Sequence, residues 1–174
     1  MISDFLGIAV SELGSISERR VARLVDGSLS GLPRFLTENG GINSGLMIAQ
    51  YTAASLVSEN KVLAHPASVD SIPTSANQED HNSMGSIGAR KCLSIVNNVK
   101  KIIAIEFLCG LQGISLLRPL KGGKGVEQTF KIIRRQISKL EDDRNISEDI
   151  KKVMAIIFDE NFLKQIEKIS GAIE

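Results

Sequence analysis

A polar segment, residues 65–83, carries the side chains of this sequence whose types could do chemistry. Both histidines of the chain and three carboxylates lie in it: His65, Asp70, Glu79, Asp80 and His81. Such groups can ligate a metal ion or act as general acids and bases. Their spacing matches no known metal motif, so we expect no metal site. Segments this long are rarely idle connections, which leaves two interpretations open: a metal-free active-site segment, or a polar loop that caps helix ends.

Two other features have chemical interpretations that we consider weaker. Glu106 interrupts the apolar run 102–117, and a buried carboxylate requires a partner. We therefore expect an ion pair or hydrogen bond to a neighbouring helix rather than a catalytic role. The run GGKG, residues 122–125, lacks the full phosphate-loop pattern and a preceding strand. It predicts a flexible turn at the start of a helix.

The elements that must position the polar segment all read as helices. Apolar residues recur at helical spacing, and no sustained alternation indicates a strand. The expected helices cover about residues 3–26, 42–64 and 84–117, then a stripe of Val126, Phe130, Ile133, Ile137 and Leu140, and finally a helix from Ser147 as N-cap to the residue before Gly171. The sequence thus predicts an all-α, long-helix bundle. We expect residues 1–120 to form its central part and residues 121–174 a charged helical pair of the same domain.

Composition restricts the classes of function. The 174 residues fit one domain. A net charge of +1 and 4% aromatic residues argue against a nucleic-acid partner or an anionic membrane. The longest uncharged stretch, residues 39–58, is too polar to span a membrane. In one helix Cys92 and Cys109 would lie roughly 25 Å apart, too far for a disulfide, so we expect a reducing, cytoplasmic location.

The charged residues are unevenly distributed. Residues 121–174 hold 11 basic and 10 acidic side chains, whereas residues 35–89 hold six charged ones. The middle of the chain therefore resembles the interior of something larger. Helices that are apolar all round must be surrounded, so we expect self-association, further polypeptide, or both.

Four runs together resemble the aromatic amino acid ammonia-lyases, and among them the histidine lyases. They are LGSISERR at 13–20, LPRFLTENGGINSGLMIAQYTAASLVSENK at 32–61, HPASVDSIPTSANQEDHNSM at 65–84 and AIEFLCGLQG at 104–113. The resemblance is close from about residue 8 to residue 113 and weak after residue 120. It implies the C-terminal part of the ammonia-lyase helical core, as a fragment or a separately encoded subunit.

The resemblance also implies chemistry. The family eliminates ammonia from an α-amino acid, and the histidine lyases convert L-histidine to urocanate during histidine degradation. Its electrophile, 4-methylidene-imidazole-5-one, forms from an internal Ala-Ser-Gly. This chain has no such tripeptide, so we expect it to be inactive alone. The family implies a homotetramer completed by the N-terminal part of the lyase.

By the same resemblance, Asn77, Gln78 and Glu79 are the site residues of this chain. Gln78 matches a glutamine near the prosthetic group. Glu79 matches the carboxylate that faces substrate in the histidine lyases, where the phenylalanine and tyrosine lyases read Asn-Gln-Asp. It would bind the imidazole or the amino group, or accept a proton. Two alternatives remain: a non-catalytic scaffold or regulatory partner of a full-length lyase, or part of a phenylalanine or tyrosine lyase or aminomutase.

Overall fold

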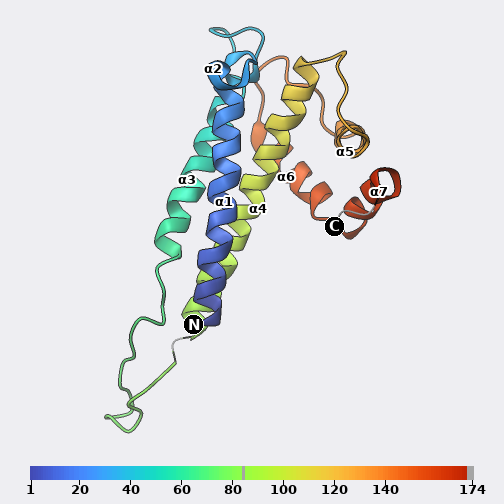
Figure 1. Ribbon diagram of the computed structural model, residues 1–174. Coiled ribbons are helices and arrows are strands. Elements are labelled where there is room, and N and C mark those ends of the chain that lie inside the picture. Colours follow the sequence, from blue (N-terminus) through green and yellow to red (C-terminus); the bar gives the residue numbers. More distant parts are fainter. Residues whose placement is uncertain (84, 172–174) are drawn as a thin grey trace.

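The computed structural model describes residues 1–83 and 85–171, and every regular element in these ranges is a helix (Figure 1). The elements are α1 (Ile2–Val25), α2 (Gly27–Ser30), the short 3-10 helix η1 (Arg34–Leu36), α3 (Met47–Leu63), α4 (Gly85–Leu116), α5 (Lys124–Arg134), α6 (Ile146–Ile157) and α7 (Glu160–Ser170). The all-α expectation is confirmed. Met84, where the third helix was expected to start, lies outside the described residues.

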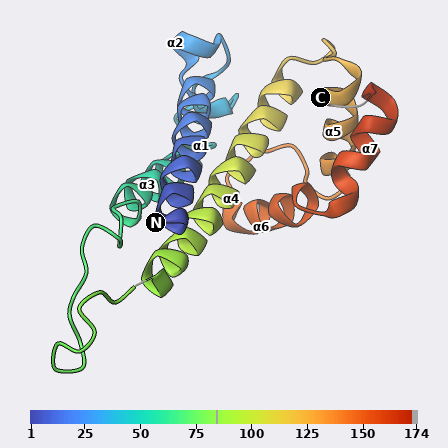
Figure 2. The same ribbon diagram turned by 60° about the horizontal axis from the view of Figure 1, so that its bottom comes forward.

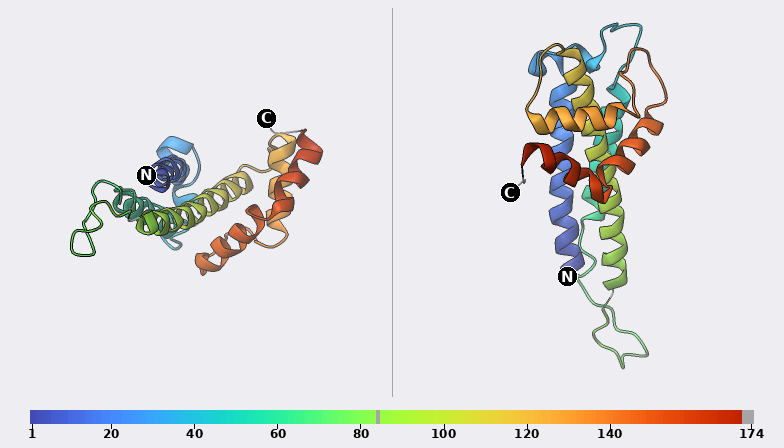
Figure 3. Two further views of the ribbon diagram at one scale, coloured as in Figure 1. Left: turned by 90° about the horizontal axis from the view of Figure 1, so that it is seen from below. Right: turned by 90° about the vertical axis from the view of Figure 1, so that its right-hand side faces the viewer.

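Helix α4 is the central element of the molecule. Its 32 residues lie between α1 and α3 on one side and the layer of α5, α6 and α7 on the other (Figures 1 and 3). Residues 65–83 extend past the end of the bundle (Figure 2). None of the described helices combines the length and apolarity needed to cross a bilayer.

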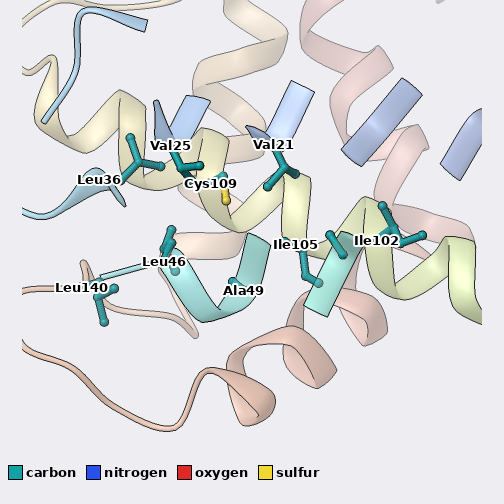
Figure 4. Packing of buried hydrophobic residues seen from close by; sticks show 10 residues of the cluster. Val21, Val25, Leu36, Leu46, Ala49, Ile102, Ile105, Cys109 and Leu140 are labelled. Carbon is teal, nitrogen blue, oxygen red and sulfur yellow. The ribbon is translucent and has the colours of Figure 1, made fainter. Parts of the chain in front are cut away.

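Two buried apolar clusters pack against α4. In the first, Val21 and Val25 of α1 meet Ala49 of α3 and Ile105 and Cys109 of α4 (Figure 4). The second joins α4 to the C-terminal layer through Ala104, Leu108, Leu111, Ile133, Ile137, Val153, Phe162 and Ile166. Because α4 contributes to both, it holds the two layers together.

Helix α1 packs on α4 through its small residues. A Cβ atom added to Gly14 would lie 3.0 Å from Cγ2 of Val99, and one added to Gly7 would lie 3.2 Å from Cδ1 of Ile95. The larger apolar side chains of α1 point away from this contact and are exposed: Ile2, Phe5, Leu6, Ile8, Leu13 and Ile16. These residues recur at helical spacing and form an apolar stripe, but within this chain the stripe is not the packed face of α1.

Several expected helix boundaries are wrong. The second helix starts at Met47 rather than near residue 42, because Gly45 has a φ of 57° and its N–H binds the Asp143 carboxylate at 2.9 Å. The fourth helix ends at Arg134. Ile137 and Leu140 therefore lie in the loop that follows it, and both side chains are buried.

The last expected helix is two helices. Asn145, not Ser147, is the N-cap of α6, and its side chain accepts the Ser147 N–H at 3.1 Å. The chain then turns at Phe158, and Asp159 caps α7 by accepting the Asn161 N–H at 2.8 Å. The sequence signal for this break is a second N-cap residue, Asp159, twelve residues after Ser147.

Cys92 and Cys109 are both free and buried on α4. Burial, with a smaller effect of the nearby Glu106 carboxylate, raises the pKa of the Cys109 thiol to about 12. This cysteine is therefore an inert core residue, since the thiolate is the reactive form.

The side chain of Gln112 joins three segments inside the core. Its Nε2 donates to the carbonyl oxygens of Leu36 at 3.1 Å and Leu140 at 2.8 Å, and its Oε1 accepts the Leu140 N–H at 3.0 Å. Gln112 is 2% exposed. Water cannot replace these bonds, so the loop after α5 depends on this amide.

We predict that Gln112→Leu lowers the free energy of unfolding by about 3 kcal/mol, because each buried polar group left without a partner costs about 1–3 kcal/mol. Urea denaturation followed by circular dichroism measures it. Gln136→Leu is the matched control at an exposed position, where substitutions usually change stability by less than about 0.5 kcal/mol. Equal midpoints for the two variants would contradict the role given to Gln112.

Candidate functional site

The segment that holds the expected site residues is a loop closed by its own hydrogen bonds. It leaves α3 after Leu63, returns to α4 at Gly85, and projects from the end of the bundle (Figure 2). Near its middle, the Asn82 N–H donates to Ser71 Oγ at 3.0 Å, and that hydroxyl lies 3.4 Å from the Asn82 carbonyl oxygen. These contacts close the neck of the loop and separate its base from its tip.

The tip is a tight turn with an unusual backbone. Ser75, Ala76 and Asn77 have φ values of 53°, 55° and 67°, a left-handed conformation that costs non-glycine residues roughly 1–2 kcal/mol each. The amide and carbonyl groups of Thr74 and Glu79 bond to each other at 2.9 and 3.3 Å and close the turn. Strain of this kind is typical of functional sites, where the surrounding structure maintains it.

The turn holds the Glu79 carboxylate by short polar side chains. Oε2 of Glu79 accepts the Thr74 hydroxyl at 3.1 Å and lies 3.4 Å from Nδ2 of Asn82, which itself donates to Thr74 Oγ1 at 3.2 Å. These neutral partners leave the carboxylate without a counter-ion within the described part of the chain. It is exposed and can bind a cationic or N–H-bearing group.

Asn77 and Gln78 lie beside Glu79 at the same tip. The Gln78 N–H bonds to the Ser75 carbonyl oxygen at 3.2 Å and so stabilises the turn, and both amide side chains are exposed. Three consecutive exposed residues at the tip therefore carry two neutral amides and one carboxylate. Such a set can orient a polar ligand and accept a proton from it.

The five titratable residues of the segment do not gather at one point. Asp70 and His81 line a hollow of about 410 Å³ at the base of the loop, together with Asp4 of α1. Glu79 and the adjacent, exposed Asp80 lie at the tip, and the carbonyl oxygen of His65 binds Nζ of Lys91. Within residues 1–83 and 85–171, no three potential ligands among His, Cys, Asp and Glu lie close enough to hold a metal ion.

Glu106 has the structural partner that was expected. Its carboxylate binds the Arg20 guanidinium through two nitrogen atoms and accepts the Ser17 hydroxyl at 2.6 Å. The hydrogen bond to Glu106 raises the pKa of Arg20 above its ordinary value. Because three donors already occupy the carboxylate, we interpret this cluster as a structural link between α1 and α4.

Sequence reasoning missed the residues that support the loop. Thr74 and Asn82 hold Glu79, and Asp4 accepts the Ala67 N–H at 3.0 Å. The one available signal was an acidic residue in the otherwise apolar start of the chain, residues 1–10. A carboxylate at a buried helix position requires donors, and here they come from a loop more than sixty residues away in sequence.

Comparisons with known proteins agree with this architecture. The family model described as aromatic amino acid lyase matches residues 1–135. Histidine ammonia-lyase from Treponema denticola is 58% identical over 165 residues, which cover 94% of this chain and 32% of that protein. The crystal structure of histidine ammonia-lyase from Trypanosoma cruzi superimposes with a TM-score of 0.92 at 52% identity, covering 95% of this chain and 33% of that chain.

A more distant relative has the same fold. Tyrosine aminomutase from Streptomyces globisporus matches with a TM-score of 0.91 at 33% identity, over 98% of this chain and 33% of that chain. The present chain thus spans about a third of the length of the curated relatives it matches. Because the family model covers more than half of the chain and the fold agrees, the chain belongs to the aromatic amino acid lyase family.

Proposed function

We propose that this chain supplies one part of a histidine ammonia-lyase, the enzyme that eliminates ammonia from L-histidine to give urocanate. The observation that carries the proposal is sequence identity. The chain is 58% and 52% identical to the two histidine ammonia-lyases compared above, but only 33% identical to the tyrosine aminomutase. The glutamate at position 79 also supports it. A carboxylate suits a substrate whose imidazole and amino groups both carry N–H donors.

The role proposed for Glu79 follows from its exposure and its neutral partners. In the elimination the Cβ–H proton leaves to a base, the Cα–N bond breaks, a carbon–carbon double bond forms, and ammonia departs. Glu79 would accept that proton or hold the imidazole or ammonium group of histidine. Thr74 and Asn82 would hold its side chain for either task, because both bond to Oε2.

Asn77 and Gln78 fit the electrophilic group of the family. Their exposed amides provide neutral donors and acceptors, which suit the carbonyl and ring nitrogens of 4-methylidene-imidazole-5-one. That group supplies an electrophile that makes the amino group a better leaving group. This chain contains no Ala-Ser-Gly, so we propose that another segment of the lyase supplies the group.

The proposal predicts the effect of Glu79→Gln in a chimera. In it, this chain replaces the corresponding third of the Treponema denticola enzyme, to which it is 58% identical. The rate constant for urocanate formation should fall about 10²–10⁴-fold, the usual contribution of a general base. Absorbance of urocanate measures the rate, and the melting temperature should stay unchanged because Glu79 is exposed.

The matched control is Asp80→Asn, which removes the neighbouring exposed carboxylate and should leave the rate within about twofold. The unmodified chain alone should form no urocanate. A Glu79→Gln chimera with the parental rate and a lowered melting temperature would assign Glu79 to loop structure instead. Turnover by the chain alone would contradict the need for another segment.

We also propose that the exposed apolar stripe of α1 is covered by another copy of the chain or by the rest of the lyase. Phe5, Leu6, Leu13 and Ile16 are 51–63% exposed. Burying one such side chain contributes about 1.5–3 kcal/mol. Leaving the whole stripe in water would therefore be costly.

We predict that the isolated chain self-associates through this stripe, and that the double substitution Leu6→Glu and Leu13→Glu shifts it to monomer. Sedimentation velocity at micromolar concentration measures the change. Ile42→Glu, at a loop position that is 88% exposed, is the control and should leave the assembly intact. A parental chain that sediments as a monomer would contradict this part of the proposal.

A further inference from the structure

The loop that carries Asn77, Gln78 and Glu79 is fastened to the bundle at its base by one carboxylate. Asp4, on the first turns of α1, is buried, and its Oδ1 accepts the Ala67 N–H at 3.0 Å. Ala67 is the third residue of the segment 65–83. An acceptor on α1 thus fixes the backbone where the loop leaves the helices.

The surroundings of Asp4 indicate a fitted contact. A Cβ atom added to Gly88 of α4 would lie 3.1 Å from Oδ1 of Asp4, so a larger residue at position 88 would crowd the carboxylate. Hydrogen bonds from the Ala67 backbone and the Ser68 side chain hold the pKa of Asp4 below its ordinary value. The carboxylate therefore stays ionised near neutral pH. It lies where α1, α4 and the loop base meet.

Two other contacts near the base of the loop hold it less firmly than the Asp4–Ala67 hydrogen bond. The Met1 amine lies 3.5 Å from Oδ2 of Asp4 but is itself 77% exposed, and exposed ion pairs contribute little. Nζ of Lys91 binds the His65 carbonyl oxygen from a long, flexible side chain. Asp4 is the buried member of this set, with a side chain that has few rotamers to lose.

A fixed base can influence the position of the tip because hydrogen bonds cross the loop at its neck and again at its tip. The Ser71–Asn82 contacts close the neck, and Asn82 continues to Thr74 and Glu79. Movement of residues 66–68 would therefore be transmitted to the turn at 75–79 rather than absorbed by slack backbone. An error of about 1 Å in such a group can cost about 100-fold in rate.

We propose that Asp4 is a positioning residue for the lyase reaction, which it supports by anchoring the loop whose tip presents Glu79. The inference rests on the proposed function of that tip. Asp4 itself touches neither substrate nor prosthetic group. It acts through Ala67, the loop neck and Asn82.

The first test follows amide hydrogen exchange in the 174-residue chain and needs no catalysis. Asp4→Ala should increase exchange of the Ala67 amide and of peptides from 66–83 about 10-fold or more, while peptides from α3 and α4 keep their protection. Asp4→Asn, which retains a carbonyl acceptor, should restore part of the protection of the loop amides. Glu12→Ala, which removes an exposed carboxylate from the same helix, should change nothing.

The second test places the same variants in the Treponema denticola chimera. Asp4→Ala should lower kcat per active site about 10-fold or more, because Glu79 is displaced from the reacting histidine. Asp4→Asn should recover part of kcat. A purely structural role would instead lower the melting temperature and the amount of active enzyme in proportion, with kcat per active site unchanged.

Each outcome decides one of the two proposals. Unchanged loop exchange in Asp4→Ala, or exchange that rises equally throughout α1, α3 and α4, would overturn the positioning role. It would leave the proposed lyase function intact if the parental chimera forms urocanate. A parental chimera without activity would contradict the proposed function, and the exchange measurement alone would then decide whether Asp4 anchors the loop.

Discussion

The close contact between α1 and α4 is the constraint on which the rest of the structure depends. Gly7 and Gly14 allow side chains of α4 to approach the backbone of α1, so the small face of α1 is the packed one. Its large apolar side chains then have to point outward. The same contact brings Ser17 and Arg20 to Glu106, and Asp4 to the base of the loop. One choice of packing face thus determines both the exposed surface and the support of the site.

Buried polar groups fix the register of the helices more sharply than the apolar clusters can. Apolar side chains tolerate sliding, whereas a hydrogen bond fails once its partner moves by an ångström or so. Asn98 Nδ2 of α4 donates to Oδ1 of Asn60 of α3 at 3.1 Å. Farther along α4, Gln112 donates to the carbonyl oxygens of Leu36 and Leu140. Removing one partner of such a pair costs more than the bond contributes. The polar contacts therefore specify one alignment of the long helices.

The sequence predicted the parts of the fold that local signals determine. It did not predict the helix boundaries that depend on contacts between residues far apart in the chain. Long apolar periodicity predicted α1, α3 and α4, and a carboxylate inside an apolar run predicted that Glu106 would have a partner on a neighbouring helix. The start of α3 could not be placed, because it depends on Asp143 binding the backbone at residues 44 and 45. Helix α5 was overextended because Ile137 and Leu140 continue its spacing while packing from a loop. Asn77, Gln78 and Glu79 were singled out as candidate site residues through family resemblance, and no periodic pattern marks Asp4, Thr74 or Asn82 as their supports.

The loop tip explains why this region is built from polar residues with short side chains. Three consecutive left-handed residues are unfavourable in isolation, so the turn at 75–77 persists only because its ends are bonded across Thr74 and Glu79 and its neck across Ser71 and Asn82. Longer side chains could make the same bonds, but they would lose more conformational entropy and hold the turn less rigidly. The turn therefore depends on rigid support of its backbone rather than on burial of its side chains. The bundle provides that support at Asp4, which lets the tip stay exposed and keep Glu79 free of a counter-ion within the described chain.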